Sequence, residues 1–417
     1  MGGRIFCSLL LASSLTLPGG RSTGAEESWI AIVGVAVLAM DSSPVRGDQT
    51  IVIAGERIEG LGPRAEIEVP AGAKVIDGRG RFLMPGLVDV HVHLRHAQPE
   101  ALLDYLRVGI TTAREMNGRP FLLEWRDRIE AGDLIGPALK VAAPTLGNFS
   151  SPREGYPTPE TAEQAREAVR RFHSAGYDWI KVYSFLEREA FEGVMEEARR
   201  LDIPVGGHVP IQVGIDDALA AGLRSIEHLT EYVGGSLSAD ARALDESDFR
   251  STFGAGEIDV ERLESLVRTT RGAGVWNVPT LVWFDRHLPT PLAREAWDRS
   301  ELRKEGARNR RWVVGKLHEH GASLAVGTDS DAGNDEPARA IYQEIAAMVE
   351  ANLSHREVLR AATIGGARLL GVEEVTGSIE VGKRADLLLL GCDPLERIEC
   401  IADPELVIVR GRIVPRE

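Results

Sequence analysis

Several features that would mark a membrane, nucleic-acid-binding or scaffold protein are missing from this sequence. The apolar stretch near the N-terminus, from Ile5 to Leu17, is about 13 residues long and too short to cross a bilayer. There is no low-complexity segment, close repeat, coiled-coil pattern or charged tail, so a purely structural role finds no support. Acidic residues outnumber basic ones by 63 to 48, which argues against nucleic acid or an anionic membrane as the partner.

The first 25 residues have the pattern of a cleaved secretory signal. Arg4 supplies a positive start, Ile5 to Leu17 is largely apolar, and small residues around Thr23-Gly24-Ala25 offer a cleavage point. The alternative is an uncleaved anchor. No cysteine follows the apolar stretch, so lipoprotein processing is not indicated. We expect residues 1–25 to be a signal peptide and the mature protein to be secreted or periplasmic, without a stable membrane anchor.

Cysteine is scarce, with three residues in the chain. Cys7 would leave with the signal peptide, and Cys392 and Cys400 would remain. In an oxidising compartment these two could form a disulfide, but their spacing does not show that the geometry fits. Two unpaired thiols in the core are the open alternative.

Both ends of the mature chain are rich in short strands. Residues 29–83 and 372–417 combine apolar segments with turn residues, which predicts a small β-sandwich module built from both chain ends. The strands expected there are Ile30–Ala39, Thr50–Ala54, Arg57–Gly60, Lys74–Asp77, Ala385–Leu390, Glu405–Val409 and Arg412–Val414.

The middle of the chain, residues 84–371, alternates strands with helices. The strands expected are Leu87–Leu94, Ile110–Glu115, Leu139–Ala143, Trp179–Tyr183, Pro204–Val209, Ser225–Leu229, Val275–Leu281 and Leu324–Asp329. The helices expected are Pro99–Arg107, Glu124–Ala131, Thr161–Ala175, Glu189–Leu201, Ile215–Ala221, Asp259–Arg271, Arg303–His320 and Ala338–Ala351. Thr158-Pro159 reads as a helix start, and Ser354 to Glu357 reads as a capping box that opens a final helix to Leu370. Strands that alternate with helices pair in parallel, so we expect an α/β fold of the (β/α)8 TIM-barrel type.

Side chains that can bind or bridge metal ions stand where five of these strands end. His91 and His93 are two residues apart in an alternating strand, so both imidazoles project from the same face. In a (β/α)8 barrel the carboxyl ends of the strands meet on one face, which holds the active site. The sequence therefore predicts a common metal centre that contains His91, His93, Lys181, His208, His228 and Asp329.

These segments resemble the amidohydrolase superfamily. Residues 85–94 (PGLVDVHVHL) look like its signature, and residues 179–183, 207–209, 226–228 and 327–330 match its further metal and catalytic positions in order. Residues 379–387 resemble the family's return to its β module. The lysine at position 181 places the resemblance in the branch with a carboxylated lysine, which contains Xaa-Pro dipeptidases and imidazolonepropionases.

The resemblance implies a centre of two divalent ions, with zinc as the usual metal. His91, His93 and Asp329 would bind the buried ion, His208 and His228 would bind the second, and Lys181 would bridge both after carbon dioxide converts its amine to a carbamate. Histidine nitrogens and a hard oxygen bridge suit zinc, although manganese, cobalt and nickel remain compatible.

The same resemblance indicates a hydrolytic mechanism. Two ions roughly 3.5–4 Å apart can bridge a water molecule and lower its pKa, so that hydroxide attacks the substrate carbonyl. Asp329 would accept the proton and pass it to the leaving nitrogen. Tyr183 lies two residues beyond Lys181 on the same face and could donate a hydrogen bond to the carbonyl oxygen; Tyr232 is an equal candidate. Arg153 or Arg114 could recognise a substrate carboxylate, with an ordinary surface ion pair as the alternative.

The leading functional hypothesis is a secreted amidohydrolase that cleaves an amide or peptide bond in a small molecule such as a dipeptide or an N-acyl amino acid. The same chemistry would serve a lactonase, a cyclic amide hydrolase or a phosphotriesterase-like enzyme. A non-catalytic metal-binding or ligand-binding protein is a different class, which a missing ligand residue would favour; none is missing here. Barrels of this family often associate, so a homo-oligomer is compatible with the sequence.

Overall fold

The computed structural model describes residues 29–94, 96–147, 157–238, 255–286, 299–332 and 337–415. The expected signal peptide and Arg153 lie outside the described residues. Among the helices that are described, none combines the length and the apolar character needed to cross a membrane.

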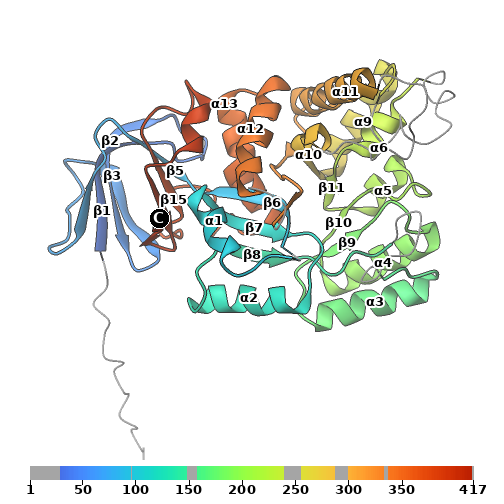
Figure 1. Cartoon of the computed structure of the whole chain (residues 1–417), viewed down its shortest axis with the longest axis horizontal. Helices are drawn as coiled ribbons and strands as arrows, with labels where there is room; N and C mark the ends of the chain where they lie inside the picture. Colours follow the sequence, from blue (N-terminus) through green and yellow to red (C-terminus); the bar gives the residue numbers. More distant parts are fainter. Residues whose placement is uncertain are drawn as a thin grey trace, which may run out of the picture.

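Strands from both ends of the chain form one hydrogen-bonded sheet at one end of the molecule, where the blue and red segments lie side by side (Figure 1). The strand order is β17-β16-β15-β5-β1-β2-β3, with β4 beside β1. Leu387–Leu390 pairs antiparallel with Phe82–Pro85, which joins the two chain ends. The strands are β1 (Trp29–Val37), β2 (Arg46–Ala54), β3 (Arg57–Pro63), β4 (Lys74–Asp77), β5 (Phe82–Pro85), β15 (Leu387–Leu390), β16 (Leu406–Val409) and β17 (Arg412–Ile413).

Alternating branched side chains build the core of this terminal sheet. Ile51 and Ile53 of β2 pack with Ile32 of β1, and all three are fully buried. The turn between β16 and β17 consists of Arg410 and Gly411, both with positive φ, at 49° and 68°. Two left-handed residues are the geometry that a tight two-residue hairpin requires.

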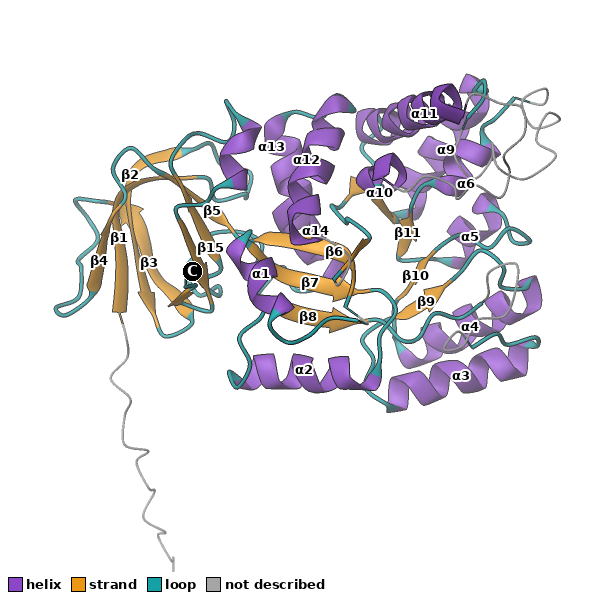
Figure 2. Ribbon diagram, viewed as in Figure 1, coloured by secondary structure: helices purple, strands orange, loops and turns teal. Residues whose placement is uncertain are grey.

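The middle of the chain forms parallel sheets flanked by helices, which confirms the predicted α/β class (Figure 2). One sheet has the order β14-β6-β7-β8 and the other the order β13-β12-β11-β10-β9. The strands are β6 (Leu87–His93), β7 (Ile110–Glu115), β8 (Ala138–Val141), β9 (Ile180–Val182), β10 (Val205–Gly207), β11 (Ser225–Glu227), β12 (Trp276–Val278), β13 (Ser323–Leu324) and β14 (Ser330–Asp331).

Backbone hydrogen bonds link these two sheets at both edges. Near β8 and β9, Ala143 N donates to the Trp179 carbonyl at 2.8 Å and Leu146 N donates to the Lys181 carbonyl at 2.8 Å. At the other edge, the segment between β13 and β14 bonds in two directions. The Val326 carbonyl accepts from Val90 N of β6 at 3.0 Å, and Ala325 N donates to the carbonyl of Asn277 in β12 at 3.1 Å.

Helices surround the parallel strands and bury their apolar sides against them (Figure 2). The third helix shows the pattern, because Ala165, Ala168, Val169 and Phe172 recur at helical spacing and all are buried. The helices are α1 (Ala101–Arg107), α2 (Pro120–Ala131), α3 (Ala162–Ser174), α4 (Arg188–Leu201), α5 (Ile215–Ala221), α6 (Thr230–Gly235), α9 (Val260–Ala273), α10 (Leu281–Arg286), α11 (Arg299–Glu319), α12 (Ala340–Glu350), α13 (His355–Arg360) and α14 (Gly366–Leu370), with a π-helical segment at Ala361–Gly365 and 3-10 turns at Pro337–Arg339 and Ile398–Ala402.

Helix starts were predicted with mixed success. The capping box at Ser354 is confirmed: its hydroxyl accepts from Glu357 N at 3.4 Å, and the Glu357 carboxylate accepts from Ser354 N at 2.8 Å. The start at Thr158 was wrong. Thr161 caps α3 instead, because its hydroxyl accepts from Gln164 N at 3.3 Å and so satisfies a free N–H of the first turn.

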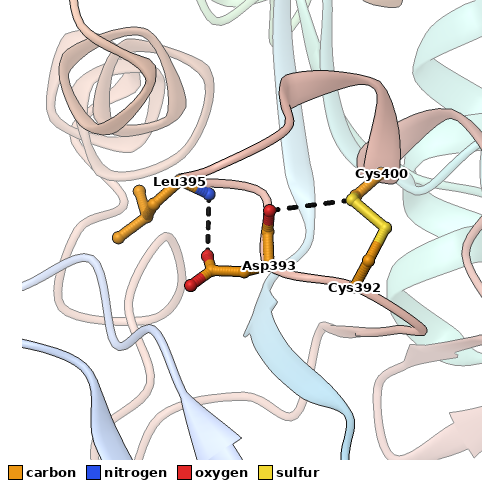
Figure 3. The surroundings of a disulfide bond; sticks show 4 residues. All are labelled: Cys392, Asp393, Leu395 and Cys400. Atoms are coloured by element: carbon orange, nitrogen blue, oxygen red, sulfur yellow. Dashed lines mark hydrogen bonds between the residues drawn. A yellow bond between two sulfur atoms is a disulfide. The ribbon is translucent and has the colours of Figure 1, made fainter.

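Cys392 and Cys400 form a disulfide, with their Cα atoms 5.7 Å apart (Figure 3). Of the two alternatives that the sequence left open, the structure has the paired one. The bond ties the chain after β15 to the 3-10 turn Ile398–Ala402. Within the loop it closes, Leu395 N donates to the Asp393 carboxylate at 2.8 Å.

Candidate metal centre

The structure brings the six predicted side chains together at the carboxyl ends of the parallel strands. His91 and His93 come from β6 and Lys181 from β9, while His208 and His228 directly follow β10 and β11, and Asp329 directly precedes β14. His91 is fully buried, Lys181 is 3 % exposed, and the Asp329 side chain is 10 % exposed.

Asp329 lies between the two histidines of β6. Its Oδ1 atom is 2.9 Å from Nε2 of His93 and 3.5 Å from Nε2 of His91. One ligand atom from each of these three residues lies within 4.8 Å of the other two. Two imidazole nitrogens and one carboxylate oxygen are a donor set that suits zinc and similar ions. The residues therefore fit a divalent ion at this position.

The remaining members of the cluster lie next to His91 and Asp329, and the His228 Nδ1 atom is 3.8 Å from Asp329 Oδ2. The Lys181 Nζ atom is 3.3 Å from His91 Nε2. The ring centroid of His228 lies 4.9 Å from that of His91 and 4.5 Å from that of His208. His208, His228 and Lys181 thus form a second group of donors beside the first.

Burial and charge together set the protonation of the cluster. Burial lowers the pKa of Lys181, which favours an uncharged amine. Burial also disfavours a charged His93, but hydrogen bonding to Asp329 and Glu115 outweighs it and raises its pKa. Burial lowers the pKa of His208 to about 3. Neutral imidazoles and an uncharged amine are the forms that can bind an ion or react with carbon dioxide, so Lys181 and His208 are shifted toward the required forms, whereas His93 would lose its proton when an ion binds.

Glutamates lie beside both β6 histidine rings, and Glu227 holds the ring of His91 by a hydrogen bond. Glu227 Oε2 accepts a hydrogen bond from His91 Nδ1 at 2.8 Å, and Glu115 Oε1 lies 3.5 Å from His93 Nδ1. A carboxylate on Nδ1 fixes the ring tautomer and leaves Nε2 for a metal ion. Sequence reasoning missed both residues. The sequence did contain a signal for Glu227. It lies two residues after Ser225 on the same face of a strand, and an acid that is buried on a strand needs a polar partner.

Arg114 is that partner, which corrects the suggestion that it recognises a substrate carboxylate. Its guanidinium donates to Glu227 at 2.7 Å and to the Val90 carbonyl at 2.6 Å, and the whole side chain is buried. The ring of Trp179 covers it at 4.5 Å. The structure does contain an ion pair at Arg114, but a fully buried one and not the ordinary surface pair that was the alternative.

Asp89 stabilises β6, the strand of His91 and His93, through buried hydrogen bonds. Its carboxylate accepts from the His91 N–H at 3.1 Å and from the Thr328 hydroxyl at 2.8 Å. Burial raises the pKa of Asp89 to about 7. These bonds connect β6 to the segment that carries Asp329, and so fix the distance between the histidines and the acid.

Hydroxyl groups, by contrast, contact the other two histidines. Ser184 Oγ lies 2.8 Å from His208 Nδ1, and Thr280 Oγ1 lies 2.8 Å from His228 Nδ1. Neither hydroxyl was identified from the sequence, because serine and threonine at strand ends are common and carry no distinguishing pattern.

The two tyrosine candidates differ in position. The Tyr183 ring stacks on that of His208, with centroids 4.1 Å apart. Tyr232 does not face the cluster: it is fully buried in α6, and its hydroxyl donates to Thr270 of α9 at 2.8 Å, since the Thr270 proton is used on the Leu266 carbonyl. The suggestion that Tyr232 contacts the substrate is therefore corrected.

The backbone is strained around this centre. His228, Leu229, Thr280 and Asp329 all have positive φ, between 48° and 70°. Gly207 precedes His208 with φ of 136°, and a Cβ there would lie 2.2 Å from the Val182 carbonyl oxygen. Conformations of this kind are costly and cluster at functional sites. They turn the chain abruptly at the strand ends and aim the side chains inward.

Comparison with known proteins agrees with this geometry. Residues 82–414 match the family model described as Amidohydrolase family. The chain is 25 % identical over 439 residues to a 5-methylthioadenosine/S-adenosylhomocysteine deaminase of Caldanaerobacter subterraneus, covering 92 % of each. It is 26 % identical over 431 residues to an imidazolonepropionase of Rubrobacter xylanophilus, covering 85 % of this chain and 90 % of that protein. The crystal structure of a candidate prolidase from Bifidobacterium longum superposes with a TM-score of 0.76 at 27 % identity, covering 93 % of this chain and 95 % of the other.

Proposed function

This chain belongs to the amidohydrolase family, and we propose that it is a metal-dependent hydrolase that cleaves an amide or peptide bond in a dipeptide or an N-acyl amino acid. The observation that carries the proposal is the convergence of His91, His93 and Asp329 within 4.8 Å, with Lys181 3.3 Å from His91. The likeness to a candidate prolidase supports a peptide-type substrate.

The ligands that we propose fall into two groups. His91, His93 and Asp329 would hold one zinc ion, and His208 and His228 would hold the second. Lys181 would bridge them after its uncharged amine adds to carbon dioxide; its burial and the lowered pKa of its amine support that step. Such ions lower the pKa of a bound water and polarise a substrate carbonyl.

The side chains of the protein would then move the proton and orient the substrate. Asp329 would accept the proton, because its carboxylate lies within the cluster, 2.9 Å from His93 and 3.5 Å from His91. It would pass that proton to the departing nitrogen. Tyr183, stacked on His208, would donate a hydrogen bond to the substrate carbonyl oxygen as negative charge develops there.

Three further features belong to the same proposal. The backbone bonds that link both edges of the parallel sheets support one closed (β/α)8 barrel over residues 84–371, in which β13 and β14 belong to one interrupted eighth strand, with the terminal sheet as a β-sandwich-like module. The disulfide between Cys392 and Cys400 supports export to a secreted or periplasmic location. An N-terminal signal peptide over residues 1–25 would provide that export.

The experiment is a substrate screen with purified, zinc-loaded protein against dipeptides, N-acyl amino acids, lactones and phosphotriesters. We expect release of a free amino acid from a member of the first two groups, lost after chelation and restored by zinc. Asp329→Asn should abolish turnover, whereas Asp178→Asn, which alters an acid bound to Arg126 away from the centre, should retain it. Turnover of lactones or phosphotriesters alone would overturn the bond type, and near-normal turnover by Asp329→Asn would overturn its role.

A further inference from the structure

Thr280 has an unfavourable backbone conformation for its residue type. It lies between β12 and α10 with φ of 48°, and it is fully buried. Among the described residues with positive φ it is the only β-branched one. A branched side chain in this region is a genuine outlier and costs of order 1–3 kcal/mol, so surrounding contacts must hold it there.

The strained conformation places the Thr280 hydroxyl on His228. Oγ1 lies 2.8 Å from His228 Nδ1, and the backbone N–H of His228 donates to the Val278 carbonyl at 2.9 Å. His228 is thereby tied to the chain at the end of β12 through its backbone N–H and, at one ring nitrogen, through Thr280. If Nδ1 carries the proton and donates it to Thr280, then Nε2 keeps its lone pair and can bind an ion.

Glu344 on α12 stabilises the turn between β12 and α10 by hydrogen bonds to its backbone. Its carboxylate accepts from Leu281 N at 2.9 Å and from Val282 N at 2.8 Å, and the side chain is fully buried. These are the first two N–H groups of α10, and Trp283 N donates to the Thr280 carbonyl at 3.1 Å. The position of Thr280 is thus fixed by α10, and the start of α10 is fixed by Glu344.

We propose that Thr280, held by Glu344, is a positioning residue that sets the ring orientation and tautomer of His228. The inference rests on the proposed function only for the identity of the ion that His228 would bind. A simpler role, in which Glu344 only caps α10, leaves the strain at Thr280 unexplained, because asparagine or glycine would adopt the same φ at lower cost.

The test compares variants that separate the hydroxyl from the fold. Thr280→Val keeps the branched shape and removes the hydroxyl, and Thr280→Ser keeps the hydroxyl. Thr363→Val is the matched control, because it removes a buried hydroxyl that bonds the Leu359 carbonyl. In zinc titrations of metal-free protein, we expect Thr280→Val to lower the affinity for the second zinc ion, the one that His228 would bind, by about 10- to 100-fold. Thr280→Ser and Thr363→Val should bind as the original protein does.

The action of Glu344 through Thr280 is tested by a double-mutant cycle. Measured above pH 8, where the original Glu344 is ionised, Glu344→Gln should also weaken binding of the second zinc equivalent, because an amide N–H then faces a backbone N–H at α10. Added to Thr280→Val, it should lower zinc affinity little further. Independent, additive losses would overturn the proposed order of action, and unchanged zinc binding by Thr280→Val would overturn the inference.

A second readout does not depend on metal. Nitrogen NMR of histidine-labelled, metal-free protein reports the tautomer of His228, with its signal assigned through a His228→Gln variant. We expect one Nδ1–H tautomer in the original protein and in Thr280→Ser, and a mixture in Thr280→Val. If the original protein takes up no second ion, the proposed function fails. The positioning role is judged separately: an altered tautomer in Thr280→Val supports it, and an unaltered tautomer contradicts it.

Discussion

The Glu227 carboxylate and the His91 imidazole form a fully buried pair in which Oε2 accepts from Nδ1 at 2.8 Å. The other carboxylate oxygen accepts from Arg114 at 2.7 Å and from the Ser225 hydroxyl at 2.6 Å. A single acid thus orients a proposed metal ligand and neutralises a buried guanidinium. The orientation of the His91 ring is therefore coupled to the stability of the strands around it.

Glu227→Gln separates these two tasks. It leaves the buried Arg114 charge without its partner, so the free energy of unfolding should fall by about 3–5 kcal/mol in chemical denaturation. Zinc affinity should fall by about 10- to 100-fold, because the single amide oxygen of glutamine cannot accept from both Arg114 and His91. Adding Arg114→Met removes this competition and should restore much of the stability and part of the zinc affinity. Unchanged zinc affinity in Glu227→Gln would show that Glu227 matters only for folding.

The two tyrosines provide a matched pair. Tyr183→Phe should lower kcat/KM by about 10²- to 10³-fold, because a hydrogen bond to the developing charge is lost. Tyr232→Phe should leave kcat/KM unchanged and cost about 1 kcal/mol of stability, since its hydroxyl bonds only Thr270 among the described contacts. Equal activities of the two variants would remove Tyr183 from the mechanism.

Glycine at position 207 is a steric requirement of the site. Gly207→Ala puts a Cβ 2.2 Å from the Val182 carbonyl oxygen at φ of 136°, and it should cost at least about 1–3 kcal/mol in thermal or chemical unfolding. Gly235→Ala is the control, because nothing lies within 4 Å of its Cβ position and its φ is not positive. We expect that variant to unfold like the original protein. A harmless Gly207→Ala would mean that the chain before His208 can relax.

Strand ends were the part of the fold that the sequence predicted least well. The strands expected over 225–229, 275–281 and 324–329 stop early, at Glu227, Val278 and Leu324. In the first two segments a residue with positive φ turns the chain within two positions of the strand end, His228 and Thr280, whereas in the third Asp329 has positive φ only at the end of the predicted range. An apolar run does not reveal the sign of φ, so the pattern extends the strand through the turn.

Interior elements, by contrast, were predicted well. The strand Ile110–Glu115 and the helix Ile215–Ala221 have the predicted bounds. The six proposed ligands could be gathered from strand ends alone, since parallel strands carry their carboxyl ends to one face. Their supporting residues Glu227, Ser184 and Thr280 could not, because each is defined by a contact with a residue distant in sequence.

Glu344 should make stability depend on pH. Burial raises its pKa from the usual 4.5 to about 8, so between these values the folded chain holds a proton that the unfolded chain has lost. The contribution is fully present below pH 4.5, decreases by about 1.4 kcal/mol per pH unit as pH rises, and is lost above pH 8. We expect the stability difference between the original protein and Glu344→Gln to follow this slope in denaturation curves. A difference that is constant across the window would contradict the raised pKa.

The most direct test of the account is zinc content per chain, measured by elemental mass spectrometry after dialysis of the zinc-loaded protein. We expect about two equivalents in the original protein. His91→Ala should lose the ion shared with His93 and Asp329, and Lys181→Ala should fall below two because the bridging group is gone. A protein that retains no zinc, or that retains the same amount after both substitutions, would contradict the proposal that these side chains form a metal centre.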